Sequence, residues 1–150
     1  MSALHSVEIM LVEDNPADLE LALLALHEAS PQSTIHVARD GVEALDYIFC
    51  EGAYASRRVE DTPNVILLDL KLPKVDGLDV LKRIKGDART KLIPIVMLTS
   101  SREQRDVVES YQLGVNSYIV KPVNFERFTE AVRNLVVYWQ LHNQSPKGGY

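Results

Sequence analysis

The sequence predicts an α/β fold, in which a doubly wound parallel sheet of five strands is covered by five helices. Short, continuously apolar segments alternate along the chain with longer segments whose apolar residues recur at helical spacing. Strands and helices that alternate in this way need crossover connections, which produce a parallel sheet with helices on both faces. The apolar runs are continuous rather than alternating, which is typical of strands buried on both faces.

The first three segments establish this alternation. Residues 7–12 are expected to form a strand, and residues 15–29 a helix with leucines and alanines at helical spacing. Asn15 suits the N-cap of that helix, and Pro16 suits its first turn. Residues 34–38 are expected to form the second strand.

The middle of the chain repeats the pattern. Residues 41–52 are expected to form a helix whose buried stripe begins at Val42. A loop over residues 53–63 leads to the third strand, residues 64–69, and a short helix follows over residues 77–87.

The last third of the chain supplies the remaining elements. Residues 93–99 and 117–120 are expected to form strands, and residues 101–115 and 124–143 helices. The final helix is expected to pack on the sheet through an apolar stripe that starts at Phe125.

The length and composition fit a single domain over residues 1–150, with a core at about residues 7–143 and a tail at residues 144–150. A net charge of −5 argues against non-specific binding to nucleic acid or to an anionic membrane surface. Cys50 is the only cysteine, so no intramolecular disulfide is possible. Neither a signal peptide nor a membrane-spanning run is visible, so the expected location is cytoplasmic.

Polar residues gather where the apolar strands end. In a doubly wound sheet, sites form at the carboxyl ends of the strands. The residues expected there are Glu13 and Asp14 after the first strand, Asp69 at the end of the third, Thr99 at the end of the fourth, and Lys121 with Pro122 after the fifth.

This set of side chains suits phosphoryl transfer. Three carboxylates at close range repel one another, and a divalent cation such as Mg²⁺ would relieve the repulsion. Lys121 adds a fixed positive charge and Thr99 a hydrogen-bond donor, which are the groups that a phosphoryl group in transit needs. Asp69 would be the nucleophile and would form an acyl phosphate.

Five motifs stand at the strand ends in chain order. They are Glu13-Asp14, the segment LLDLKLPKVDG with Asp69, Pro73 and Gly77, the segment LTS with Thr99, Tyr118 in YIV, and Lys121-Pro122. Together they resemble the receiver domain of response regulators, which has a flavodoxin-like topology. The resemblance covers roughly residues 7–143.

The resemblance implies a role for each acid. Asp69 would accept a phosphoryl group from a phosphohistidine on a sensor histidine kinase, so the chain would be a phosphoacceptor rather than an enzyme. Glu13 and Asp14 would hold Mg²⁺ together with Asp69 and the backbone carbonyl of Lys71.

It also implies a switch at the neighbouring strands. Lys121 would pair with the phosphoryl group, and a cis peptide bond before Pro122 would aim it there. Thr99 would move to hydrogen-bond the phosphoryl group, and Tyr118 would turn inward behind it. Tyr118 is equally compatible with an ordinary core position.

Three further segments are similar to stand-alone receivers that serve cyanobacterial phytochromes. They are DYIFCEGAYASRR, TSSREQRDVVESYQLGVNSYIVKPVNFERF and the YW pair at residues 138–139. A phytochrome-type kinase is therefore the expected partner. Residues 144–150 are too few to form an output domain, so the expected output is contact with an unknown downstream protein. A phosphorelay intermediate and an adaptor that acts without phosphorylation are the alternatives.

Other classes of protein fit the sequence less well. A flavin carrier needs a loop rich in Gly, Ser and Thr after the first strand, whereas the acidic VEDNPAD stands here. A phosphatase with an aspartyl nucleophile would usually carry a second aspartate two residues after Asp69, where this chain has Lys71. A receiver that has lost phosphorylation usually lacks an acid or the lysine, and here all are present.

The end of the last helix predicts a homodimer. Val137, Tyr138 and Leu141 point away from the stripe that should pack on the sheet. An apolar surface of this kind usually marks an interface, and a two-fold dimer is the commonest arrangement.

Overall fold

A five-stranded parallel sheet forms the centre of the molecule. The computed structural model describes residues 7–99, 112–115, 117–120 and 125–134. The strands run in the order β2-β1-β3-β4-β5, which confirms the predicted doubly wound sheet. Their bounds are β1 Glu8–Val12, β2 Thr34–Ala38, β3 Val65–Asp69, β4 Ile95–Thr99 and β5 Ser117–Val120.

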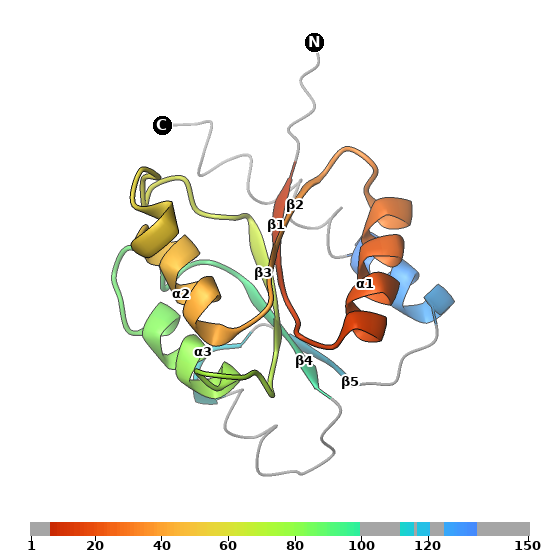
Figure 1. The fold of residues 1–150 in the computed structure, drawn as a ribbon. Coiled ribbons are helices and arrows are strands. Elements are labelled where there is room, and N and C mark those ends of the chain that lie inside the picture. Colours follow the sequence, from red (N-terminus) through yellow and green to blue (C-terminus); the bar gives the residue numbers. More distant parts are fainter. Residues whose placement is uncertain (1–6, 100–111, 116, 121–124, 135–150) are drawn as a thin grey trace.

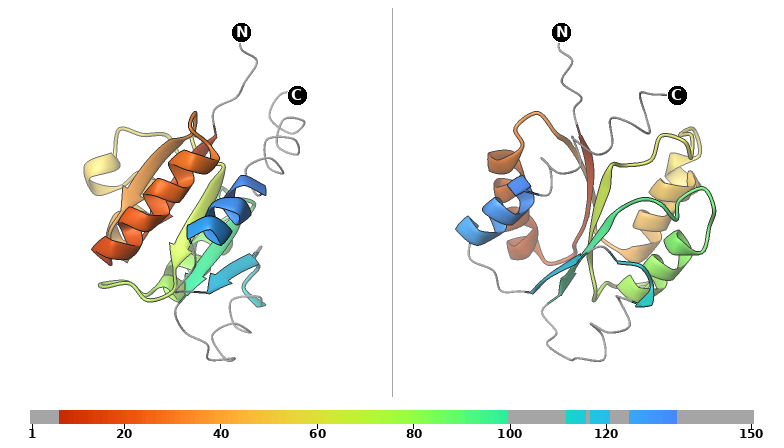
Figure 2. Two further views of the ribbon diagram at one scale, coloured as in Figure 1. Left: turned by 90° about the vertical axis from the view of Figure 1, so that its right-hand side faces the viewer. Right: turned by 180° about the vertical axis from the view of Figure 1, so that it is seen from behind.

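Helices cover both faces of this sheet. Helix α1 (Pro16–Ala29) and the helix at residues 125–134 lie on one face, and α2 (Gly41–Phe49) and α3 (Gly77–Lys85) lie on the other (Figures 1 and 2). A short 3-10 helix, η1 (Gly52–Tyr54), follows α2. Most of the predicted helix at 101–115 lies outside the described residues.

The hydrophobic core has two halves, divided by the sheet. Alternate residues of each strand point to opposite faces, so Met10 and Ile66 pack with α2 and α3, whereas Leu11 and Leu67 pack with α1 and the last helix. All five residues of β3 are buried. The continuous apolar runs in the sequence therefore reflect a central strand that is covered on both sides.

The start of α1 follows its capping residues. The Asn15 side chain accepts a hydrogen bond from the backbone N–H of Asp18 at 2.9 Å, and Pro16 is the first helical residue. The cap satisfies a backbone donor that the helix leaves unpaired, and proline has no such donor to lose. Both assignments made from the sequence are confirmed.

The buried stripes of two helices begin later than predicted, and one of these helices ends earlier. Helix α2 ends at Phe49 rather than at residue 52, because Cys50 takes a left-handed conformation with φ of 58°. Val42 is 40% exposed, since Gly41 occupies the inward position at the start of α2. Phe125 is 38% exposed, whereas Phe128 is buried as expected.

An aromatic cluster joins β2 to α2 and the loop after it. The His36 ring stacks on the Tyr47 ring with centroids 3.7 Å apart, and the Arg57 guanidinium lies 3.7 Å from the Tyr47 centroid. Tyr47 donates a hydrogen bond to Glu8 Oε2 at 2.6 Å. The buried Nε2 of His36 has no hydrogen-bond partner in the described part of the chain. The cluster therefore favours a neutral histidine.

The helices of the described ranges are all too short or too polar to cross a membrane.

The His36 environment predicts a loss of stability in acid. Burial lowers the pKa of His36 below 6.5, so below that pH the unfolded chain binds a proton that the folded chain resists. The free energy of unfolding should fall as the pH drops from about 7.5 to about 5.5. The variant His36→Phe, which keeps an aromatic ring on Tyr47, should lose less stability over the same interval.

Urea unfolding at the two pH values measures this difference. His27→Phe is the matched control, because His27 is exposed on α1 and should leave the pH dependence as it is in the unaltered protein. An equal fall in stability for His36→Phe and the unaltered protein would contradict the assignment.

Candidate functional site

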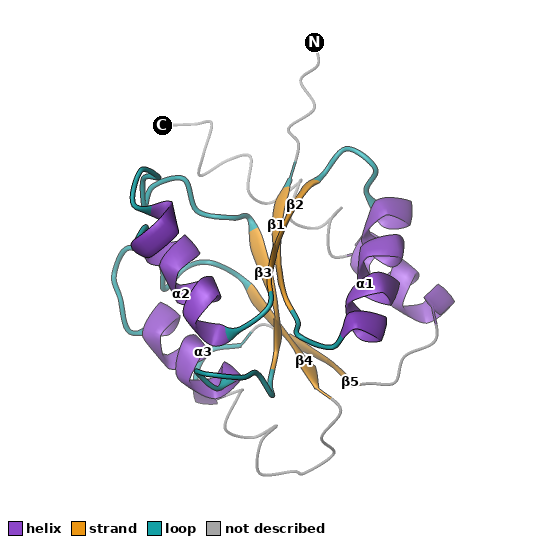
Figure 3. Cartoon of the chain, viewed as in Figure 1, coloured by secondary structure: helices purple, strands orange, loops and turns teal. Residues whose placement is uncertain are grey.

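The register of β1 and β3 brings the acidic residues together. Val12 pairs with Leu68, so the residues that follow these two strands emerge side by side. One carboxylate oxygen from each of Glu13, Asp14 and Asp69 lies within 4.8 Å of the other two. The cluster lies at the carboxyl ends of the strands, where β3 passes into a loop (Figure 3). The sequence prediction for the position of these three acids is confirmed.

The cluster combines burial with like charge. Glu13 is 1% exposed and Asp69 6% exposed, whereas Asp14 reaches solvent. Backbone N–H groups reach two of the carboxylates: Asn15 donates to Glu13 Oε2 and Lys71 donates to Asp69 Oδ1, each at 3.2 Å. The three carboxylates repel one another at this range, so a cation bound between them is favoured. A set of carboxylate oxygens at this spacing fits a hard divalent ion.

The chain after Asp69 stays close to the sheet. The Leu70 N–H donates to the Leu98 carbonyl at 2.8 Å, and the Gly77 N–H donates to the Leu70 carbonyl at 3.0 Å. A Cβ atom on Gly77 would lie 2.2 Å from the Asp69 carbonyl oxygen and 2.5 Å from that of Leu70. Only glycine allows α3 to start this close to the backbone of the acidic residue.

A tight turn in this loop fastens it to α2. Lys74 has a φ of 70°, and the Val75 N–H donates to the Pro73 carbonyl at 2.8 Å, which closes a γ-turn. The Gly41 N–H donates to the same carbonyl at 3.3 Å. The Lys74 ammonium lies 3.4 Å from Asp40 Oδ2. The loop beside Asp69 is thus held by the first turn of α2.

Asp40 serves both the loop and the helix. Its Oδ1 accepts a hydrogen bond from the Glu43 N–H at 2.8 Å, which caps α2. That hydrogen bond and, to a smaller extent, the nearby Lys74 hold the pKa of Asp40 below its usual value. The carboxylate therefore stays charged at neutral pH and keeps its attraction for Lys74.

The structure also locates the strand residues predicted for the switch. Thr99 ends β4 and pairs with Val120, and Tyr118 pairs with Met97. Their proposed roles remain predictions. The other predicted residues, Lys121 and Pro122 of the site and Val137, Tyr138 and Leu141 of the dimer interface, lie outside the described residues.

The anchors of the loop were not predicted as part of the site. Gly41 was assigned only to the start of a helix, yet a Cβ there would lie 2.0 Å from the Val75 carbonyl oxygen. The glycine at this position was the feature of the sequence that could have indicated so close a contact. Lys74 gave no signal, because a positive φ at lysine does not follow from its residue type.

Comparison with known proteins places the chain in a family. The sequence profile of the response regulator receiver domain matches residues 9–133. The chain therefore belongs to the response-regulator receiver family.

Among the related proteins are phytochrome response regulators. The response regulator Rcp1 from Synechocystis sp. is 38% identical over 131 residues, which cover 87% of each chain. The structure of the phosphorylated cyanobacterial phytochrome response regulator RcpA is 41% identical, with a TM-score of 0.80 over 90% of this chain and 94% of that one. The bacteriophytochrome response regulator AtBRR is 54% identical, with a TM-score of 0.75 over 91% and 96%.

One relative has been solved with a metal. The Mn²⁺-bound form of Rcp1 is 37% identical to this chain, with a TM-score of 0.78 over 89% of this chain and 94% of that one. The acidic cluster of Glu13, Asp14 and Asp69 is a candidate divalent-metal site on its own geometry.

The close approach of Gly77 yields a prediction about the loop. Gly77→Ala should lower the free energy of unfolding by about 2 kcal/mol, because the backbone after Asp69 must move to admit a methyl group. Gly86→Ala at the other end of α3 is the matched control, since its Cβ would lie 3.0 Å from the nearest atom and its φ of −88° is permitted. Urea unfolding measures both. Equal losses for the two variants would contradict the argument.

Proposed function

We propose that this chain is a response regulator that accepts a phosphoryl group on Asp69 from a sensor histidine kinase. The observation that carries the proposal is the position of Asp69. Asp69 ends the central strand, and one of its carboxylate oxygens lies within 4.8 Å of a carboxylate oxygen from each of Glu13 and Asp14. Membership of the receiver family supports the same reaction.

The proposed reaction is a displacement at phosphorus. A carboxylate oxygen of Asp69 forms a bond to phosphorus as the bond from phosphorus to the imidazole nitrogen of the kinase phosphohistidine breaks. The electron pair of that bond stays on the imidazole nitrogen, and the product on this chain is an acyl phosphate. The Lys71 N–H, which donates to Asp69 Oδ1, helps to orient the carboxylate. The chain itself is a phosphoacceptor rather than an enzyme with a separate substrate.

The metal in this proposal is Mg²⁺. When bound, it would neutralise charge that the incoming phosphoryl group adds to an already anionic site. Glu13 and Asp14 would hold it together with Asp69 and the backbone carbonyl of Lys71. The carboxylate spacing supports the site, and the preference of Mg²⁺ for few carboxylates plus phosphate oxygens supports the choice of ion.

The proposed partner is a kinase of the phytochrome type. Structures of phytochrome and bacteriophytochrome response regulators match about nine-tenths of the chain, and AtBRR is 54% identical over 91% of it. A phytochrome-type kinase should transfer phosphate about tenfold faster than an unrelated histidine kinase, a ratio that corresponds to about 1.4 kcal/mol in activation free energy.

Asp69→Asn should abolish formation of the acyl phosphate, because the amide cannot act as the nucleophile. Incubation with acetyl phosphate, or with a phosphorylated histidine kinase, followed by mass measurement of the intact protein tests this. Asp76→Asn is the matched control, since Asp76 is an exposed acid of the same loop that makes no side-chain cap to α3. Phosphate at an acid- and base-labile site in Asp69→Asn would show that another residue is the acceptor.

Asp14→Ala should weaken Mg²⁺ binding by about 100-fold, because one anionic ligand is lost. The same change should raise the free energy of unfolding in EDTA by about 1 kcal/mol, because repulsion with Glu13 and Asp69 is relieved. Thermal unfolding with EDTA and with excess Mg²⁺ measures both effects. Glu20→Ala, an exposed acid on α1, should do neither. An equal Mg²⁺-dependent rise in Tm for Asp14→Ala and the unaltered protein would exclude Asp14 as a ligand.

A further inference from the structure

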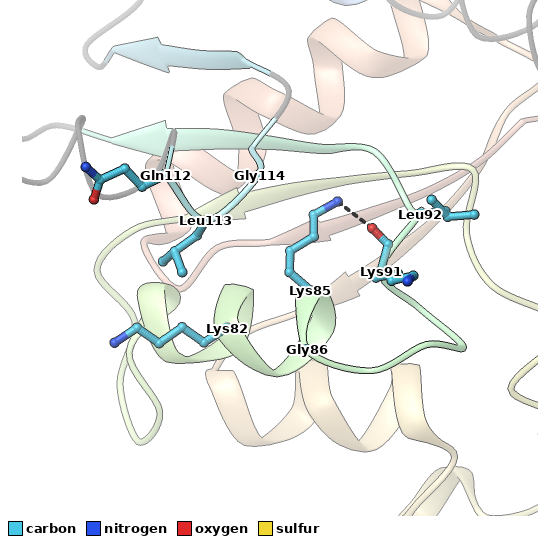
Figure 4. Close-up of a pocket in the computed structure, with 8 residues that line it drawn as sticks. All are labelled: Lys82, Lys85, Gly86, Lys91, Leu92, Gln112, Leu113 and Gly114. Carbon is cyan, nitrogen blue, oxygen red and sulfur yellow. Dashed lines mark hydrogen bonds between the residues drawn. The ribbon is translucent and has the colours of Figure 1, made fainter.

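A groove lies at the opposite end of the sheet from the acidic cluster. It has a volume of about 480 Å³ and lies between the C-terminal end of α3, the loop before β4 and residues 112–114 (Figure 4). The loop before β4 lines the groove, whereas the other end of β4 lies next to Asp69, because Leu98 pairs with that residue. The groove is therefore separate from the proposed phosphorylation site.

The lining of the groove is basic. Lys82, Lys85 and Lys91 contribute to it, and no acidic residue of the described ranges lines it. None of the three forms a salt bridge with a carboxylate of the described ranges. The chain as a whole carries a net charge of −5, so this is a local concentration of positive charge on an acidic protein.

The central lysine is fixed in place. The Lys85 ammonium donates to the Lys91 carbonyl at 3.0 Å and to the Ile93 carbonyl at 2.8 Å (Figure 4). Gly114 adjoins its side chain, so that a Cβ there would touch the Lys85 Cδ and Cε atoms at 3.8 Å. Burial lowers the pKa of Lys85, which means that its charge lacks full hydration. An anion in the groove would compensate for that loss, and an ammonium group has a third N–H to offer.

Two leucines flank the groove, on opposite sides of Lys85 (Figure 4). Leu92 is 86% exposed, the largest exposure among the large hydrophobic residues of the described ranges. The Leu113 side chain points toward α3 (Figure 4). The dipole of α3 accounts for Lys82 and Lys85 near its C-terminal end, but Lys91 and Leu92 lie beyond the helix. An exposed leucine beside clustered lysines suits a ligand that has both negative and apolar groups.

We propose that this groove docks an acidic segment of a partner protein, whose carboxylates contact Lys82, Lys85 and Lys91 and whose aliphatic side chain packs on Leu92. A simple inorganic anion would gain nothing from Leu92. The charge complementarity and the exposed leucine together select an acidic peptide with apolar residues. The proposal is independent of the phosphoryl chemistry at Asp69.

A labelled peptide tests the proposal directly. The probe is a fluorescein-labelled peptide of repeated Glu-Glu-Leu, with repeated Lys-Lys-Leu and Glu-Glu-Ser peptides as controls, and anisotropy of the full chain at low salt reports binding. The double variant Lys82→Glu, Lys91→Glu should weaken binding of the Glu-Glu-Leu peptide about tenfold. Leu92→Ser should weaken it about fivefold. Lys85 is left unchanged, because its ammonium also holds two backbone carbonyls.

Two controls separate the groove from general charge and from the phosphorylation site. Arg133→Glu reverses an exposed charge on the helix at residues 125–134 and should leave binding as it is. The unaltered chain and all groove variants should take phosphate from acetyl phosphate. Failure of the unaltered chain to do so would count against the function proposed for Asp69 and not against the groove. Absence of Glu-Glu-Leu binding, unchanged affinity in the double variant, or equal affinity for the Glu-Glu-Ser peptide would overturn the docking proposal. Competition by inorganic polyphosphate that is unaffected by Leu92→Ser would show a general anion site instead.

Discussion

The burial of Asp69 among other acids is the constraint on which the site depends. The central strand β3 is covered on both faces, and its last residue is a carboxylate that is only 6% exposed. Glu13, which is buried still more deeply, follows the neighbouring strand. A fold that brings buried like charges together loses free energy unless a cation or a proton offsets them. The stability of this edge of the sheet is thus linked to whatever positive charge binds there.

The loop after Asp69 is anchored by backbone contacts close to the acidic cluster. The Leu98 carbonyl and the Leu70 carbonyl hold the first part of the loop, and the Pro73 carbonyl joins its tip to α2. Gly77 and Gly41 permit these contacts, because any side chain at either position would collide with the backbone of the loop. The carboxylate is therefore positioned by backbone contacts on both sides, which is the arrangement that an oriented nucleophile requires.

The sequence was sufficient for the sheet and for the acidic cluster, because both follow from one-dimensional patterns. Continuous apolar runs identified the strands, and the parallel arrangement then placed Glu13, Asp14 and Asp69 at one edge. The residues that hold the loop beside the site could not be predicted from the sequence. The positive φ of Lys74 and its attraction to Asp40 arise from the packing of the loop on α2, which no local pattern encodes. The buried stripe predicted for α2 is right at Leu45 and Phe49, and only Val42 at its start is exposed, because helical spacing cannot show where a buried stripe begins.

Opposite charges lie near the two ends of β4, with the acidic cluster at one end and the lysines of the groove at the other. The distance between them decides how strongly one can affect the other. Strand β4 has five residues, so its first and last residues lie about 13 Å apart at the usual rise of a strand. This distance exceeds the screening length of about 8 Å for exposed charges at physiological ionic strength. Solvent therefore weakens the effect of added charge at Asp69 on the exposed Lys82 and Lys91, whereas the half-buried Lys85 is screened less. Any stronger coupling would have to pass through a displacement of β4 itself, whose side chains are packed between the two halves of the core. Electrostatics alone therefore couples the proposed docking at the groove only weakly to the state of Asp69, so the groove would suit a partner that stays bound while the acidic edge changes its charge.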